Sequence, residues 1–447
     1  MSAKSVLHSQ CSRRELLTVA LVISMLLAVV HPSLCKEIIL YDQQINAANP
    51  QGTLTVGNDG VLYGVASQGG GGGYGAIFTL TPPAKGQTDW TETILYAFPG
   101  GTDGGYPYNS LTPDGQGGFF GITDQGGTGS CPIFYGEAGC GTVYHLTPPA
   151  QGSTNWIHTV LYSFQGGTDG NAASGQLLLD SATGVLYGDT FIGGAYGAGT
   201  VFALTPPAQG QTNWTETLLH TFTGGSDGGY PLCNLIEDAS GNLYGTTYAG
   251  GYVGSGTAFE MSRPPQGETN WTETVLYSFQ GVGYGDAGNP WAGLVPDGSG
   301  NLFGAATTGG SSGYENDGAI FELSPPSGGG TAWTEKILYS FTGGKDGAVA
   351  DNALILDSEG AIYSTTQAGG SWNYGTAFRL APPVAGQPAW TFNLLYSFRG
   401  SPDGWEALGL TPGKVGKKVV LFGVTTNGGT DDNDGTVFEL TNTGYAF

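Results

Sequence analysis

Trp271-Thr-Glu-Thr-Val-Leu-Tyr-Ser-Phe279 and Trp333-Thr-Glu-Lys-Ile-Leu-Tyr-Ser-Phe341 decide the fold of this chain, because they are two copies of one segment. The leading tryptophan recurs about every 60 residues along the 447-residue sequence. Its six copies are Trp90, Trp156, Trp214, Trp271, Trp333 and Trp390. A period of this length is typical of a solenoid, an array or a propeller built from one supersecondary unit. We therefore expect one large repeat domain, in which the six tryptophans have a packing role.

Each repeat contains four segments with the turn signals of short β-strands. In the clearest copy, residues 292–297 end in an Asp-Gly-Ser-Gly turn, and residues 301–307 and 318–323 form the next two segments. Ser324-Pro-Pro326 ends the third strand, because proline has no N–H to donate to a neighbouring strand. The tryptophan-led segment 333–341 is the fourth. Four short antiparallel strands per repeat predict the blade of a β-propeller.

The number of copies predicts how the ring closes. The third strand occurs seven times, whereas the tryptophan-led fourth strand occurs only six times. Glu37-Ile-Ile-Leu-Tyr41 matches the Glu-x-x-Leu-Tyr core of the missing copy. We expect an all-β, seven-bladed propeller whose last blade takes three strands from the C-terminus and its outer strand from the N-terminus, which closes the ring and pairs strand edges that would otherwise invite aggregation. An open β-solenoid is the alternative, but it would require capping repeats.

The first 35 residues differ in kind from the domain at 36–447. Lys4, Arg13 and Arg14 precede an uncharged apolar run at 16–30, which fits an export signal and is short for a membrane span. The adjacent arginines leave two routes open, the general secretory route and twin-arginine export. A lipidated Cys35 is disfavoured because Leu34, not a small residue, precedes it. We predict a secreted protein, extracellular or periplasmic, with no transmembrane segment in the mature chain.

The composition excludes some partners. The formal net charge is −23, and nucleic acids and anionic lipids attract basic surfaces, so nucleic acid is not an expected partner. Nothing in the sequence indicates a cofactor, although acidic side chains can hold Ca²⁺. We expect a monomer whose partner, if it has one, is a polysaccharide or another cell-envelope polymer.

Three cysteines remain after the signal. Cys131 and Cys140 bracket the one long insertion in the repeat, and an exported protein meets oxidising conditions. A disulfide is favoured over a metal site there, because no nearby histidine or further cysteine completes a ligand set. We expect Cys233 to be buried.

One recurrent acidic position is a candidate site. A Gly-Gly-x-Asp-Gly type of segment precedes the innermost strand of six blades and supplies Asp103, Asp169, Asp227, Asp286, Asp346 and Asp403. If the strands run outward from the axis, we expect these carboxylates to ring the mouth of the central channel, where they could bind a cation or sugar hydroxyls. The alternative is that each aspartate bonds its own turn. Asp431, Asp432 and Asp434 form a weaker candidate metal site in the last blade.

Loops on the same predicted face differ between copies, as a recognition surface requires. They are the insertion 131–140 and the segments 248–255, 311–317 and 371–374. Aromatic residues that could stack on sugars there are Trp291, Trp372, Tyr106, Tyr230, Tyr252 and Trp405, of which Trp372 and Trp405 are our candidate ligand-binding positions. Packing against neighbouring blades is the alternative role for these rings.

Catalysis has little support in the sequence. His145, His158 and His220 each occupy a strand position that other copies fill with other residues, which indicates blade surfaces and not a triad or a metal centre. We therefore name no catalytic residue and favour a binding or structural protein. The alternative is a polysaccharide-active enzyme, a glycosidase or lyase, that uses the channel-mouth carboxylates.

The repeat resembles a known family. Its Leu-Tyr-Ser-Phe, Gly-Gly-x-Asp-Gly, Gly-Asn-Leu-Tyr-Gly and Gly-Thr-x-Phe-x-Leu-Thr-Pro-Pro segments are similar to those of the GloVer (Gloeobacter/Verrucomicrobia) tandem repeat of exported bacterial proteins. The resemblance covers nearly everything after Cys35. It implies an exported repeat protein, but no activity comes with the family.

Overall fold

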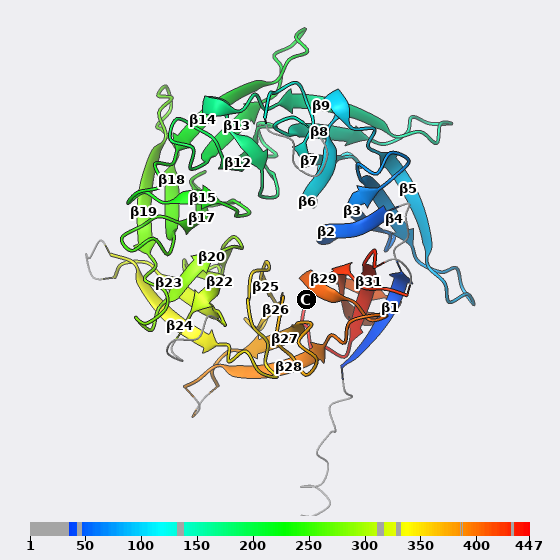
Figure 1. Ribbon diagram of the computed structural model, residues 1–447, viewed down its shortest axis with the longest axis vertical. Helices are drawn as coiled ribbons and strands as arrows, with labels where there is room; N and C mark the ends of the chain where they lie inside the picture. Colours follow the sequence, from blue (N-terminus) through cyan, green and yellow to red (C-terminus); the bar gives the residue numbers. More distant parts are fainter. Residues whose placement is uncertain are drawn as a thin grey trace, which may run out of the picture. The chain divides into compact units, whose positions relative to one another are not determined.

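Seven antiparallel β-sheets follow one another around a central axis in the computed structural model of the protein (Figure 1). We number these sheets as blades 1 to 7 in chain order. The structure describes residues 35–42, 47–131, 138–310, 317–327, 332–384, 386, 388–430 and 433–447. Two short 3₁₀ helices, Gly101–Asp103 and Gly167–Asp169, are the other regular elements of these residues.

In blades 1 to 6 the strand order in the sheet follows the chain from the innermost strand outward, and blade 7 differs only in its outermost strand, which comes from the start of the chain. Blades 1 and 2 contain β2 (Ala47–Val56), β3 (Leu62–Gly69), β4 (Ala76–Thr81) and β5 (Thr91–Ala97), then β6 (Gly105–Pro113), β7 (Phe119–Gln125), β8 (Thr142–Thr147) and β9 (Ile157–Ser163). The innermost strand is split in two in blades 3 to 5. Blade 3 contains β10 (Asn171–Ala173), β11 (Leu178–Leu179), β12 (Leu186–Ile192), β13 (Thr200–Thr205) and β14 (Thr215–Thr221). Blade 4 contains β15 (Gly229–Pro231), β16 (Ile236–Glu237), β17 (Leu243–Ala249), β18 (Thr257–Ser262) and β19 (Thr272–Ser278).

The remaining blades complete the circle. Blade 5 contains β20 (Ala287–Pro290), β21 (Val295–Pro296), β22 (Leu302–Gly309), β23 (Ala319–Ser324) and β24 (Thr334–Ser340). Blade 6 contains β25 (Ile355–Leu356), β26 (Ile362–Thr366), β27 (Thr376–Ala381) and β28 (Thr391–Ser397). Blade 7 contains β29 (Trp405–Val415), β30 (Lys418–Asn427), β31 (Thr436–Thr441) and β1 (Lys36–Asp42).

Strand β1 closes the ring. It pairs antiparallel with β31, with Lys36 opposite Thr441 and Glu37 opposite Leu440. Figure 1 shows the blue β1 at the outer side of the red β31. The predicted seven-bladed propeller, with its last blade shared between the two ends of the chain, is therefore confirmed.

A glycine and an aromatic ring determine the packing inside each blade. Phe321 on β23 is fully buried and lies opposite Gly304 on β22. A Cβ atom added to Gly304 would lie 2.2 Å from the Phe321 ring, so only glycine leaves room for the ring at this position. The same pairing joins Gly64 to Phe78 and Gly423 to Phe438. The recurrent Gly of the second strand is thus a packing residue.

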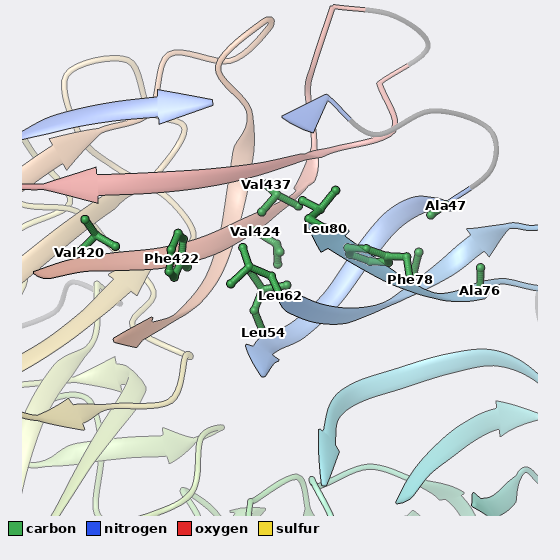
Figure 2. Packing of buried hydrophobic residues seen from close by; sticks show 11 residues of the cluster. Ala47, Leu54, Leu62, Ala76, Phe78, Leu80, Val420, Phe422, Val424 and Val437 are labelled. Atoms are coloured by element: carbon green, nitrogen blue, oxygen red, sulfur yellow. The ribbon is translucent and has the colours of Figure 1, made fainter. Parts of the chain in front are cut away.

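Neighbouring blades pack through their hydrophobic faces. At the junction where the ring closes, Leu62 and Phe78 of blade 1 lie in one buried cluster with Phe422 and Val437 of blade 7 (Figure 2). Trp90 packs at the edge of this cluster, with its ring 6.1 Å from that of Phe422. The other five repeat tryptophans also pack against neighbouring side chains, as expected from the sequence: Trp156, Trp214, Trp271, Trp333 and Trp390. Burial of such large side chains stabilises each junction by about 1.5–3 kcal/mol per residue.

The cysteines have the arrangement expected for an oxidising compartment. A disulfide joins Cys131 to Cys140, and the thiol of Cys233 is fully buried. Residues 132–137 of the bracketed loop lie outside the described residues. In the described part of the chain, we find no helix with the length and apolar character needed to span a bilayer.

Candidate functional site

The six recurrent aspartates bind to the outer strands of the blades. Each carboxylate lies within hydrogen-bond distance of a tyrosine or histidine side chain on the preceding outer strand. The pairs and their distances are Tyr96 Oη–Asp103 (2.9 Å), Tyr162 Oη–Asp169 (2.6 Å), His220 Nε2–Asp227 (3.3 Å), Tyr277 Oη–Asp286 (3.1 Å), Tyr339 Oη–Asp346 (2.9 Å) and Tyr396 Oη–Asp403 (2.8 Å). In five of the six, a backbone N–H of the same loop donates a second bond, as from Thr342 to Asp346 at 3.0 Å. These carboxylates therefore hold turns at the outer strands.

This placement corrects the expected ring at the channel mouth. None of the six aspartates is among the described residues that line the cavities on the axis. The physical reason is that each carboxylate bonds a tyrosine or histidine of the preceding outer strand, and five of the six also bond a backbone N–H of their own loop. In three blades the residue three positions further on, Tyr106, Ala172 or Glu406, lines the mouth of the channel where the sequence had suggested the aspartate.

Those residues share a rare backbone conformation. Each blade has one non-glycine residue with φ between 53° and 59° at this position: Asn49, Tyr106, Ala172, Tyr230, Asn289, Val349 and Glu406. The left-handed region is sparsely populated by such side chains and persists only where the surroundings impose it. In the first six of these residues a backbone bond to the preceding blade imposes it, as from Tyr106 N–H to the carbonyl of Tyr74 at 2.7 Å.

A channel follows the axis and is divided into three parts. The mouth cavity, about 460 Å³, lies where the innermost strands begin and is bounded by four of the left-handed residues, Asn49, Tyr106, Ala172 and Glu406. Below it a waist of about 90 Å³ is lined by short segments of all seven blades. The lower cavity, about 550 Å³, lies where those strands end, and leucines contribute much of its wall.

The wall of the mouth cavity combines aromatic rings with polar groups. Its rings are Tyr106, Tyr108, Phe191 and Trp291. Its amides are Asn49, Gln51, Gln68 and Asn427, and its hydroxyls include Ser67, Ser174 and Thr426. Apolar surface together with a few placed polar groups is the general character of a small-molecule site.

Three carboxyl groups border the mouth cavity and the waist. Glu406 accepts hydrogen bonds from the amide of Asn427 at 2.6 Å and the hydroxyl of Thr426 at 3.2 Å. Burial raises the pKa of Asp124 in the same wall. In the waist, burial and, to a smaller extent, the negative charge of Glu406 raise the pKa of Asp351 to about 7.

The aromatic residues named from the sequence are dispersed. Trp291 and Tyr106 line the mouth cavity. Trp372 is 60% exposed in the loop between β26 and β27, whereas the ring of Trp405 packs 5.5 Å from that of Tyr374. Tyr252 is exposed in the corresponding loop of blade 4, and Tyr230 packs against Phe191.

The candidate cation positions are only partly described. Asp431 and Asp432 lie outside the described residues, and the carbonyl of Asp434 accepts the N–H of Asn49 at 2.7 Å. Where the structure describes the chain, no group of three or more His, Cys, Asp or Glu side chains is placed to hold a metal ion.

The three histidines lie in the blades, away from the channel. His145 contacts Asp114 at 2.9 Å in a separate cavity between blades 2 and 3. Burial lowers the pKa of His158 to about 4, and its ring stacks on Tyr96 at 4.4 Å. His220 contacts one of the recurrent aspartates.

Sequence reasoning missed most of the mouth cavity. Its wall includes Gln51, Tyr108, Asp124, Phe191 and Glu406, which come from blades 1, 2, 3 and 7. One feature of the sequence could have pointed to this cavity. The third residue after the recurrent aspartate varies between copies, as expected of a position that contacts a ligand.

Comparison with known proteins identifies the family. The sequence matches the Gloeobacter/Verrucomicrobia repeat over residues 133–349 and 265–447, so the chain belongs to this repeat family. No curated protein matches it.

Similar solved structures include several enzymes that act on carbohydrates. A polysaccharide lyase family 25 ulvan lyase bound to a glucuronate–sulfated rhamnose unit has a TM-score of 0.50 at 10% identity, over 90% of this chain and 95% of that one. The polysaccharide lyase Uly1 has a TM-score of 0.48 at 12% identity, over 90% and 93% of the two chains. A family AA12 enzyme of Trichoderma reesei has a TM-score of 0.42 at 14% identity, over 92% and 96%. At these identities the likeness extends to the fold alone.

Proposed function

We propose that this chain is an exported, non-catalytic binding protein that holds a polysaccharide at the mouth cavity of its propeller. The observation that carries the proposal is the wall of that cavity, where Tyr106, Tyr108 and Trp291 stand among amides, hydroxyls and carboxylates. A sugar presents an apolar ring face that stacks on an aromatic side chain and hydroxyls that both donate and accept hydrogen bonds. The cavity offers both kinds of contact within about 460 Å³, the size of an ordinary ligand site.

The distribution of variable residues supports a recognition role. The left-handed position is Asn in two blades, Tyr in two, and Ala, Val or Glu in the others, while the strands around it repeat. Binding residues on a repeated scaffold are free to differ in this way, because the backbone conformation is maintained by contacts between blades.

Further contacts with a long polymer lie outside the cavity. Trp372, exposed in its loop, and Trp405, at the start of β29, belong to segments at the same end of the blades as the mouth cavity. We assign them to stacking on sugar units beyond the one held in the cavity. The export signal in residues 1–35 would deliver the protein to the compartment that contains such polymers.

Isothermal titration with oligosaccharides of increasing length tests this function on residues 36–447. Trp291→Ala should weaken binding of a short oligosaccharide at least about fivefold, because aromatic stacking contributes about 1 kcal/mol or more. Trp372→Ala should weaken only long chains, and the exposed outer-strand variant Ile157→Ala should change neither. Absence of binding to any glycan, or binding that Trp291→Ala leaves intact, would refute the proposal.

A polysaccharide-active enzyme is the second candidate, favoured by two carboxyl groups in one cavity. Asp124 has a raised pKa and Glu406 is held by two donors, which resembles the acid and carboxylate roles of a glycoside hydrolase. Screening the purified protein for released sugars tests it. Product formation that both Asp124→Asn and Glu406→Gln abolish would support an enzyme in place of a binding protein.

A further inference from the structure

The upper part of the channel has a single sign of charge. Asp124 and Glu406 line the mouth cavity and Asp351 lines the waist, and neither part has a lysine, arginine or histidine among its described lining residues. The protein as a whole has a formal charge of −23. A cleft with walls of one sign concentrates ligands of the opposite sign, because the low-dielectric wall focuses the field.

Glu406 is held in a fixed position in this cavity. Its backbone is left-handed with φ 56°, and its carboxylate accepts bonds from Thr426 and Asn427 on the neighbouring β30. These donors are neutral, and the described lining of the cavity offers the carboxylate no cationic partner. Its charge also acts on Asp351, whose pKa is raised partly by Glu406. The cavity therefore contains more negative charge than its own walls compensate.

Resting on the binding function proposed above, we infer that the mouth cavity selects a sugar that carries a protonated amino group and rejects polymers of uronic or sulfated sugars. An ammonium group offers three donors to the carboxylates of Asp124 and Glu406, and charge-assisted bonds of this kind are about twice as strong as neutral ones. The rings of Tyr106 and Trp291 are available to the apolar face of the same sugar, and aromatic faces also attract cations.

The carboxylates of the cavity would repel an anionic sugar. A uronate or sulfate group entering the cavity would lose water and face Glu406 with no cation to compensate its charge. Its exclusion follows from electrostatics even where the shape fits. The likeness in fold to an ulvan lyase, whose bound unit is anionic, therefore does not extend to the ligand class.

The test compares three hexamers of similar size by isothermal titration at about pH 6: a glucosamine hexamer, its neutral N-acetylated form and a galacturonate hexamer. We expect the glucosamine hexamer to bind at least about tenfold more tightly than the acetylated one, and the galacturonate hexamer not to bind. Glu406→Gln should reduce this preference about tenfold, and a urea unfolding transition like that of the wild type shows that the variant is folded. The matched control Glu359→Gln, exposed in the turn before β26, should alter neither affinity.

Each outcome decides between the hypotheses. Equal affinity for the amino and acetylated hexamers, or binding of the galacturonate hexamer, overturns the charge selectivity and leaves the binding function standing. Failure of every hexamer to bind overturns both. A preference that Glu406→Gln does not reduce overturns the assignment of the selectivity to this cavity.

Discussion

Glu335→Gln should make the protein more stable at alkaline pH. Glu335 lies on the outer strand β24, and its Oε1 and the Oδ1 of Asp286 are both buried without a hydrogen-bond partner among the described residues. Burial, followed by the nearby charge of Asp286, raises the pKa of Glu335 to about 8. A proton on Glu335 would serve both oxygens, so the folded state favours the neutral acid. A glutamine is neutral at every pH and has an N–H to offer Asp286.

The sign and size follow from proton linkage. The carboxyl pKa is raised on folding, so its stabilising effect is complete below about pH 4.5, the unfolded value, and is lost as the pH rises through about 8. In that window the free energy of unfolding falls by up to about 1.4 kcal/mol per pH unit. Partial solvent exposure of the side chain reduces the total. We expect the variant and the wild type to be similar at pH 5 and the variant to be more stable by about 2 kcal/mol at pH 8.

Urea unfolding between pH 5 and pH 8, followed by tryptophan fluorescence, measures this difference. The control is Glu268→Gln, which changes an exposed glutamate in the loop after β18 and should reproduce the wild-type pH dependence. The wild type should lose stability over this range through further outer-strand glutamates with raised pKa values: Glu37, Glu92, Glu216 and Glu273. A wild type and a Glu335→Gln variant with the same pH slope would refute a buried, protonated Glu335.

Three further predictions concern the scaffold. In urea unfolding, Phe321→Ala should lower the free energy of unfolding by about 3–5 kcal/mol and Gly304→Ala by about 1–3 kcal/mol. A Gly304→Ala variant as stable as the wild type would contradict the contact between this position and the Phe321 ring. Deletion of residues 36–42 should expose the edge of β31 and cause association in size-exclusion chromatography; a stable monomer would count against closure by β1. Replacing Cys131 and Cys140 by serine should cost roughly 2–3 kcal/mol for a loop of sequence separation 9, and a melting temperature insensitive to reductant would contradict this.

The fold was predictable because turn signals in each repeat mark where its strands end. The Glu-x-x-Leu-Tyr core of the outer strand is present in residues 37–41, and strand β1 pairs where this match places it. Gly304 and Phe321 recur in register, so the blade could be recognised without any knowledge of side-chain contacts.

The site was less predictable, because it depends on backbone conformation and on contacts between blades. Asp346 was assigned to the channel from its place in the loop, but the loop gives it Tyr339 and the Thr342 N–H as donors. The residue that does line the mouth, such as Tyr106 or Glu406, is left-handed although neither type favours that region. For Tyr106 a backbone bond to Tyr74 of the preceding blade imposes this conformation, and that bond forms only when the ring is assembled.

A crystal structure of residues 36–447 with a bound glucosamine hexamer tests the central claim most directly. We predict that one sugar unit lies in the mouth cavity, with its ring face on Trp291 or Tyr106 and its amino group within hydrogen-bond distance of Glu406. A hexamer bound only at the outer edges of the blades, with the mouth cavity free of sugar, would contradict the account.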